Sequence, residues 1–191
     1  SPANVSFEAG AVIEPTAICV TSILERSRLQ AGESVVITGP GPIGLISLAV
    51  TRAAGVRIAG ITGRSADEGI RFEKARELGA DFIVNVDQED PVNKVLEMTN
   101  GLGFDLLIET SGGGKAIFQA FEMVRRMGRI CAIGISGKEE VPIPYDRGIF
   151  KALRYDFCFS SSWTAWETTI GLISKGVLPI EKIIPHKLPL E

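Results

Sequence analysis

The feature that most constrains the fold of this chain is a glycine-rich turn between two segments of different periodicity. Residues 34–38 form a continuous apolar run rich in β-branched side chains, as in a buried strand. Residues 42–54 repeat apolar side chains at helical spacing. Between them lies Gly39-x-Gly41-x-x-Gly44. A strand, a tight glycine turn and a helix in this order predict the start of a β-α-β unit.

The alternation of strand-like and helical segments continues toward the C-terminus. Expected strands cover residues 56–62, 81–86, 104–109, 129–135 and 155–160, and expected helices cover residues 16–26, 66–78, 91–99, 115–127 and 163–175. Residues 141–144 contain two prolines and predict a loop or a sheet edge, and residues 183–190 predict a final strand or tail. The expected fold class is α/β: a Rossmann-type, doubly wound parallel sheet in three layers, with helices on both faces.

Each glycine of the turn has a predicted task in binding a dinucleotide. Gly39 lets the chain turn sharply out of the strand, and Gly41 lets the backbone approach a pyrophosphate. Gly44 lets the helix pack closely on the strand. The helix then starts at Pro42 and Ile43, and the free N–H groups of its first turn and the positive end of the helix dipole favour phosphate. The alternative is a glycine turn that serves the fold alone.

The residues after the second expected strand bear on which dinucleotide binds. An NAD site expects an acidic residue about twenty positions after the glycines, because its carboxylate accepts hydrogen bonds from the ribose. This chain has Gly63-Arg64-Ser65 there. Gly63 leaves room, Arg64 can bind a 2′-phosphate, Ser65 can add a hydroxyl donor, and Arg71 is a second candidate cation. NADP is therefore the predicted cofactor, and the absence of an acid also weighs against an S-adenosylmethionine methyltransferase. The alternative is that Arg64 is a solvated surface side chain and the site binds NAD poorly or loosely.

Composition excludes several other classes of function. A net charge of −3 gives no reason to expect nucleic acid or an anionic membrane as a partner. No apolar run approaches the roughly 20 residues that a spanning helix needs. The start of the chain lacks the basic and apolar regions of a signal peptide, so we expect a cytoplasmic protein. Cys19, Cys131 and Cys158 are far apart in sequence, which is typical of buried or free thiols. The single histidine, His186, excludes a relay that needs more than one.

Several segments together resemble the zinc-type medium-chain alcohol and polyol dehydrogenases, in the sorbitol and threonine dehydrogenase branch. They are GAVIEPTAICVTSILERSRLQAGESVVITGPGPIGLISLAVTRAAG, RFEKARELGADFIVN, GFDLLIETSGG and IIPHKLPLE. The resemblance implies a cofactor domain from a larger enzyme whose other, N-terminal domain carries the zinc ligands. It also implies that residues 1–33 lead out of that domain, with a helix packed on the sheet, and that residues 34–191 form the NAD(P)-binding domain.

The resemblance also assigns roles to single residues. Glu14 matches a position at or near the zinc in a full-length parent, or only shapes the entry to the next helix. Thr110 and Ser111 match positions beside the riboses, Gly134 and Ile135 match backbone beside the nicotinamide, and His186 matches a structural histidine. Most members of the branch carry Asp where this chain has Gly63, which favours NADP over NAD.

The predicted function is that of the cofactor domain of a zinc-dependent oxidoreductase. The parent would transfer a hydride between NADP(H) and a secondary alcohol, polyol or ketone, and this domain alone would be inactive. The alternative is a stand-alone NADP(H)-binding module that senses redox state. Members of the family associate through a sheet edge near the residues that match 141–144, so a homodimer is expected.

Overall fold

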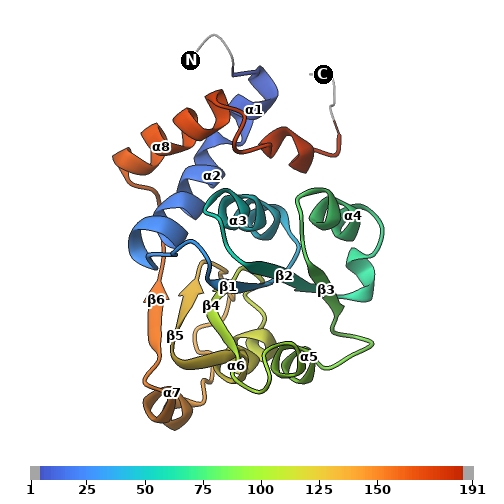
Figure 1. Ribbon diagram of the computed structural model, residues 1–191, viewed down its shortest axis with the longest axis vertical. Helices are drawn as coiled ribbons and strands as arrows, with labels where there is room; N and C mark the ends of the chain where they lie inside the picture. Colours follow the sequence, from blue (N-terminus) through green and yellow to red (C-terminus); the bar gives the residue numbers. More distant parts are fainter. Residues whose placement is uncertain (1–4, 187–191) are drawn as a thin grey trace.

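The computed structural model describes residues 5–186 and contains one sheet of parallel strands (Figure 1). In the described residues the strand order is β3-β2-β1-β4-β5-β6. The strands are β1 (Ser34–Thr38), β2 (Ile58–Gly63), β3 (Phe82–Asn85), β4 (Phe104–Glu109), β5 (Val124–Ala132) and β6 (Arg154–Phe157). The chain moves outward from β1 to β3 and then returns to place β4 on the other side of β1. The direction of winding therefore reverses between β1 and β4, as in a doubly wound sheet.

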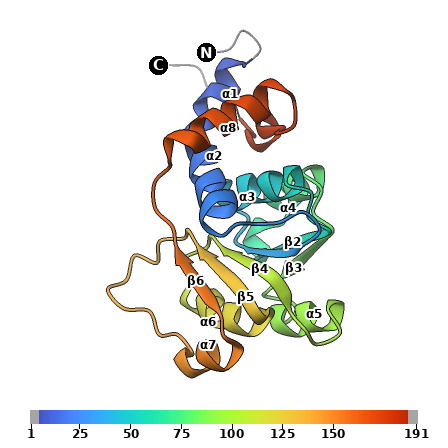
Figure 2. The same cartoon turned by 60° about the vertical axis from the view of Figure 1, so that its left-hand side comes forward.

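Helices cover both faces of this sheet. They are α1 (Phe7–Ala11), α2 (Ile13–Val20), α3 (Pro42–Ala53), α4 (Ile70–Glu77), α5 (Pro91–Met98), α6 (Gly114–Met123), α7 (Tyr145–Lys151) and α8 (Trp163–Ser174), with the helical turns η1 (Thr21–Arg26), η2 (Ser65–Asp67) and η3 (Ile180–Ile183). Figures 1 and 2 show α2, α3, α4 and α8 on one side of the sheet and α5, α6 and α7 on the other. The predicted three-layer α/β fold is confirmed.

Alternating side chains of the central strands build two separate cores. Val35 and Ile37 of β1 pack in the core beneath α2 and α3, and Val36 between them packs in the core beneath α5 and α6. All three side chains are fully buried. Burial on both faces explains why this strand is a continuous apolar run rather than an alternating one.

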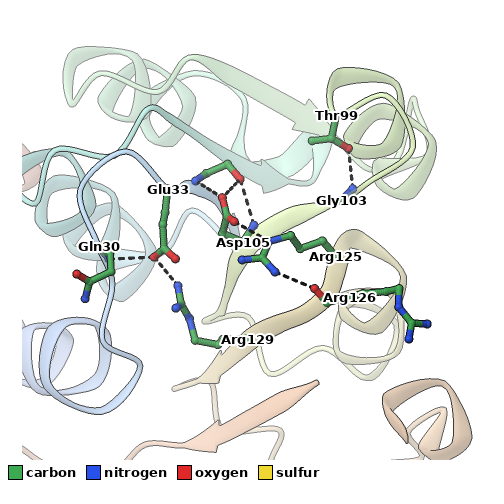
Figure 3. A network of polar contacts seen from close by, with 9 residues as sticks. Gln30, Glu33, Thr99, Gly103, Asp105, Arg125, Arg126 and Arg129 are labelled. Carbon is green, nitrogen blue, oxygen red and sulfur yellow. Dashed lines mark hydrogen bonds and ion pairs between the residues drawn. The ribbon is translucent and has the colours of Figure 1, made fainter. Parts of the chain in front are cut away.

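The predicted helix over residues 115–127 was too long, because α6 ends at Met123 and residues 124–132 form β5. Polar contacts end the helix there. Lys151 Nζ donates hydrogen bonds of 2.8–2.9 Å to three carbonyl oxygens at the end of α6 and the start of β5. Arg125 Nε lies 2.7 Å from Asp105 Oδ1, which holds the following residues beside β4 (Figure 3). Long-range partners of this kind cannot be read from helical spacing.

Two other predicted helices have different bounds in the structure. The helix expected over residues 66–78 is divided into η2 and α4 at Gly69, whose φ is +83°. The helix expected from residue 16 begins at Ile13, so Glu14 lies in its first turn, and its end is the π-helical turn η1. Of the segment expected as a final strand or tail, residue 183 ends η3 and residues 184–186 have no regular structure, which fits a tail; the rest of that prediction lies outside the described residues. Residues 141–144 are a loop, as the two prolines predicted.

A polar network joins β1, β4 and β5 at their amino ends (Figure 3). Asp105 Oδ2 accepts hydrogen bonds from the Ser34 amide at 2.7 Å and its hydroxyl at 2.6 Å. Glu33 accepts from the Gln30 amide at 2.9 Å and pairs with Arg129. Burial tends to raise the pKa of Asp105. The hydrogen bonds from Ser34 and Arg125 outweigh burial and hold this pKa below the ordinary value. The amino ends of the strands are thus tied together, and the site lies at the opposite edge.

In the part of the chain that the structure describes, no helix has the length and apolar character needed to cross a membrane.

Candidate functional site

A cleft of about 680 Å³ opens at the carboxyl ends of the strands, where the winding direction reverses. Its walls come from the turn after β1, the residues after β2 and the loop that joins β4 to α6. The lining residues are Thr38, Gly39, Pro40, Gly41, Thr62, Gly63, Arg64, Asp67, Arg71, Val86, Asp87, Pro91, Thr110, Ser111, Gly113, Gly114, Lys115, Ala116, Gln119 and Met123. A doubly wound sheet binds its ligands in this crevice.

The glycine turn is packed tightly on one side and open on the other. Gly39 has a φ of +92°, and its amide donates a 2.9 Å hydrogen bond to Thr62 O. A Cβ on Gly44 would lie 1.9 Å from Gly39 O, so only glycine fits between helix and turn. A Cβ on Gly41 would meet no protein atom within 4 Å, although Gly41 lines the cleft. Gly41 is also the N-cap of α3 and provides no side-chain cap, which leaves the first helical N–H groups available to a ligand.

A buried carboxylate, which sequence reasoning missed, shapes the opposite wall. Glu109 at the end of β4 is fully buried. Its Oε1 accepts hydrogen bonds from the Ser111 hydroxyl at 2.5 Å, the Ser111 amide at 2.9 Å and the Gly112 amide at 3.0 Å. The Thr110 hydroxyl donates to Thr38 O at 2.7 Å and lies 3.0 Å from Gly39 O. Thr110 and Ser111 therefore hold the β4 loop against the glycine turn, and both line the cleft.

At the end of β2 the two predicted cations lie beside two carboxylates. Arg64 has an exposed side chain, and its Nε is 3.5 Å from Asp87 Oδ1. Arg71 Nη1 is 2.5 Å from Asp67 Oδ1, while Asp67 Oδ2 accepts a 2.9 Å hydrogen bond from the Arg64 amide. Asp67 is only 8% exposed and, like Asp87, lines the cleft. Sequence reasoning missed both acids. Asp67 could have been found, because it lies four residues before Arg71, the spacing at which side chains pair along a helix.

Gly63 and Ser65 serve the local backbone. A Cβ on Gly63 would lie 2.6 Å from Phe72 Cε1 and 2.8 Å from Pro40 Cγ, so a larger residue requires both neighbours to shift. The Ser65 amide donates a 2.9 Å hydrogen bond to Asp87 Oδ2, and this bond lowers the pKa of Asp87. Ser65 is not among the residues that line the cleft. The same is true of Pro42, Ile43 and Gly44, which form the first turn of α3.

A second cleft, of about 450 Å³, lies next to the first, at the carboxyl ends of β4, β5 and β6. Gly134 and Ile135 line it, together with Glu109 and the loop residues Val141 and Ile143. A Cβ on Gly134 would lie 2.5 Å from the Gly112 amide nitrogen, so a glycine is needed for β5 to pass the β4 loop. Glu109 lines the second cleft, and its partner Ser111 lines the first.

The remaining predicted residues lie away from both clefts. Glu14 is exposed in the first turn of α2, and His186 is exposed after η3. Within residues 5–186, no three His, Cys, Asp or Glu side chains are grouped so that they could hold a metal ion. The described residues therefore do not form a zinc site by themselves. Lys115 of α6 was missed by sequence reasoning and adds a third cation to the first cleft.

A doubly wound parallel sheet with an open helix N-terminus at its reversal point defines a Rossmann nucleotide-binding domain. The family model described as zinc-binding dehydrogenase matches residues 42–175, and the chain belongs to this family. The resemblance seen in the sequence is thereby confirmed.

The chain matches about one half of longer relatives. D-arabitol-phosphate dehydrogenase from Enterococcus avium is 32% identical over 189 residues, covering 99% of this chain and 53% of that protein. L-threonine 3-dehydrogenase from Pyrococcus furiosus is 36% identical over 190 residues, covering 98% and 53%. The solved structure of alcohol dehydrogenase TADH from Thermus sp. ATN1 has a TM-score of 0.89 and 31% identity, covering 97% of this chain and 54% of that chain.

Proposed function

We propose that this chain is the cofactor domain of a zinc-dependent oxidoreductase that transfers a hydride between NADP(H) and a secondary alcohol, polyol or ketone. The observation that carries the proposal is Gly41, which is open to the cleft at the uncapped start of α3. The names of the relatives support the class of substrate, and their extra length supports a second domain that supplies the zinc ligands. This chain alone binds cofactor and is inactive.

In this proposal the residues of the first cleft hold most of the dinucleotide. The pyrophosphate lies against the first turn of α3, beside Gly41. The adenosine ribose lies toward Arg64 at the end of β2, and the nicotinamide lies toward Gly134 in the second cleft. The bound nicotinamide supplies the hydride chemistry. The protein contributes orientation, through the Gly39 turn and the Glu109 hydrogen bonds that fix the facing loop.

The contacts at the end of β2 support a preference for NADP. Arg64 has only a 3.5 Å contact to Asp87 and an exposed side chain, so a 2′-phosphate can attract it at little cost. A carboxylate at position 63, as an NAD site would place there, meets Phe72 and Pro40. Asp67 is the observation that favours the second candidate, NAD, because its carboxylate lines the cleft. Both of its oxygens already accept hydrogen bonds from the protein, so a ribose hydroxyl would have to compete with those donors.

The test is calorimetric titration of this chain with NADPH and with NADH. A lost charge-assisted contact is worth about 1.5–3 kcal/mol, so Arg64→Ala should weaken NADPH binding at least tenfold and leave NADH binding unchanged. Arg57→Ala is the matched control, because Arg57 is an exposed arginine just before the opposite end of β2. Equal binding of NADPH and NADH, or an equal effect of Arg64→Ala and Arg57→Ala, would contradict the preference for NADP. The cofactor would then be NAD, or neither of the two.

We also propose that the parent is a homodimer through the β6 edge of the sheet. β6 is the last strand at that edge of the described sheet, and Phe157, at its end, is 75% exposed. Nearby Tyr145 and Phe150 of α7 are 69% and 70% exposed. Analytical ultracentrifugation should show a dimer that Phe157→Asp dissociates, with Phe7→Asp, at an exposed phenylalanine of α1, as the control. A monomeric wild-type chain would refute this.

A further inference from the structure

Two cysteines that are 27 positions apart in the sequence meet where β5 and β6 end. Cys131 is the penultimate residue of β5, and Cys158 follows the last residue of β6. Their sulfur atoms are 3.8 Å apart. The Cys158 amide donates a 2.9 Å hydrogen bond to Ala132 O, which fixes this pairing of the two strands. The spacing of the cysteines predicted buried or free thiols, and all three are buried and free in the structure. The proximity of Cys131 and Cys158 arises from the sheet order, in which β5 pairs with β6.

The two thiols differ in access. Cys131 is fully buried, and its Sγ also lies 3.6 Å from Ser22 O in η1. Cys158 is 8% exposed and is one of the residues that line the second cleft, so it is the thiol that a small molecule can approach. Cys158 is therefore the thiol placed to react first, with Cys131 directly behind it.

The hydrogen bond between the thiols also separates their acidities. The Cys131 thiol stabilises the Cys158 thiolate and lowers the pKa of Cys158 to about 7. The pKa of Cys131 lies well above the ordinary value, because of the same hydrogen bond and its burial. The two sulfurs thus hold one proton between them near neutral pH, and Cys158 has the thiolate character that attack requires.

We propose that Cys131 and Cys158 are a redox-active pair that a hydroperoxide converts into a disulfide. The Cys158 thiolate attacks the terminal oxygen of the peroxide, the O–O bond breaks, and the alkoxide or hydroxide that leaves takes up a proton. The resulting sulfenic acid is attacked by the Cys131 sulfur, the S–S bond forms, and water leaves. Two thiols and one hydroperoxide thus give one disulfide, one alcohol or water, and one water, and two electrons pass from sulfur to oxygen.

Closing the pair requires a modest movement. The sulfurs must approach from 3.8 Å to the bond length of about 2.0 Å. Cys158 lies one residue beyond β6, between two exposed phenylalanines, so the two side chains can approach each other while the Cys158 amide keeps its hydrogen bond to Ala132 O. Gly134 lines the same cleft, and closure therefore changes the wall beside it. This inference does not depend on the cofactor that the first cleft binds.

The test is oxidation of this chain with hydrogen peroxide near neutral pH. The proposal predicts that denatured, oxidised protein has one titratable thiol in place of three, and that its intact mass is lower by two hydrogen atoms. Proteolytic mapping should join the peptides of Cys131 and Cys158, and dithiothreitol should restore all three thiols. Cys19→Ser is the control, since the Cys19 sulfur contacts Ile43 O and the Ser47 hydroxyl, and its removal should leave the linkage unchanged.

A second variant identifies the first sulfur to react. In Cys131→Ser, a sulfenic acid at Cys158 should accumulate and be trapped by dimedone, whereas in Cys158→Ser the Cys131 thiol should react much more slowly. Three thiols remaining after oxidation of the wild-type chain, or a linkage between two molecules or to Cys19, would overturn the proposal. The wild-type mapping decides the outcome even if one of these variants fails to fold.

Discussion

Two neighbouring glycine substitutions should separate the structural task of the turn from its binding task. In Gly44→Ala the new Cβ lies 1.9 Å from Gly39 O, and ordinary contact begins at 3.4 Å, so the turn and α3 must move apart. In Gly41→Ala the new Cβ meets no protein atom within 4 Å and projects where the dinucleotide is proposed to pass. The first variant tests packing and the second tests the cleft.

The two substitutions should differ in how much they lower the free energy of unfolding. Overpacking of this sort costs about 1–3 kcal/mol, and weakening of the Thr110 contacts adds about 1 kcal/mol. The better helix propensity of alanine returns up to about 1 kcal/mol. Gly44→Ala should therefore lower the free energy of unfolding by about 2 kcal/mol. Gly41→Ala changes only an N-cap and should cost about 1 kcal/mol or less.

Urea denaturation followed by tryptophan fluorescence measures the free energy of unfolding, and calorimetric titration measures the affinity for NADPH. Gly41→Ala should keep nearly the wild-type unfolding midpoint and lose at least about tenfold in NADPH affinity, or about 1.4 kcal/mol. Gly44→Ala should lower both the unfolding midpoint and the affinity for NADPH. Unchanged NADPH binding by Gly41→Ala would refute the placement of the pyrophosphate beside this residue.

Three further outcomes follow from the contacts of single residues. Lys151→Met should lower the free energy of unfolding by about 2–3 kcal/mol in urea, because three carbonyl groups at the end of α6 lose a charged donor; an unchanged midpoint would contradict this. The pKa of Asp105 is lowered in the folded state, so its contribution to stability is present at neutral pH and is lost as the pH falls below about 4. Asp105→Asn should therefore flatten the pH dependence of the free energy of unfolding in that range, and parallel curves for the two proteins would count against this. Asp67→Asn removes the partner of Arg71 and should tighten NADPH binding several-fold relative to NADH by calorimetry; weaker NADPH binding at unchanged stability would show instead that Asp67 holds Arg71 in place.

The glycine turn could be read from the sequence because its requirements are local. A strand, a positive φ at Gly39 and a close helix are all consequences of neighbouring residues. The apolar run of β1 likewise predicted burial on both faces, since a central parallel strand has no wet side.

The rest of the site depends on contacts between distant segments. Glu109 ends an apolar strand, and it is buried because β1 and β5, both distant in the sequence, pair with β4 on either side of it. The early end of α6 depends on Lys151, more than twenty residues away. Asp87 reaches the end of β2 only because β3 pairs with that strand. Such partners are determined by the sheet order, which helical or strand periodicity does not specify.

A crystal structure of this chain with NADPH tests the central claim most directly. The account predicts the pyrophosphate against the first turn of α3 beside Gly41, and the 2′-phosphate within hydrogen-bond distance of the Arg64 guanidinium. NADPH bound elsewhere, or a 2′-phosphate that points into solvent while Arg64 stays beside Asp87, would contradict it.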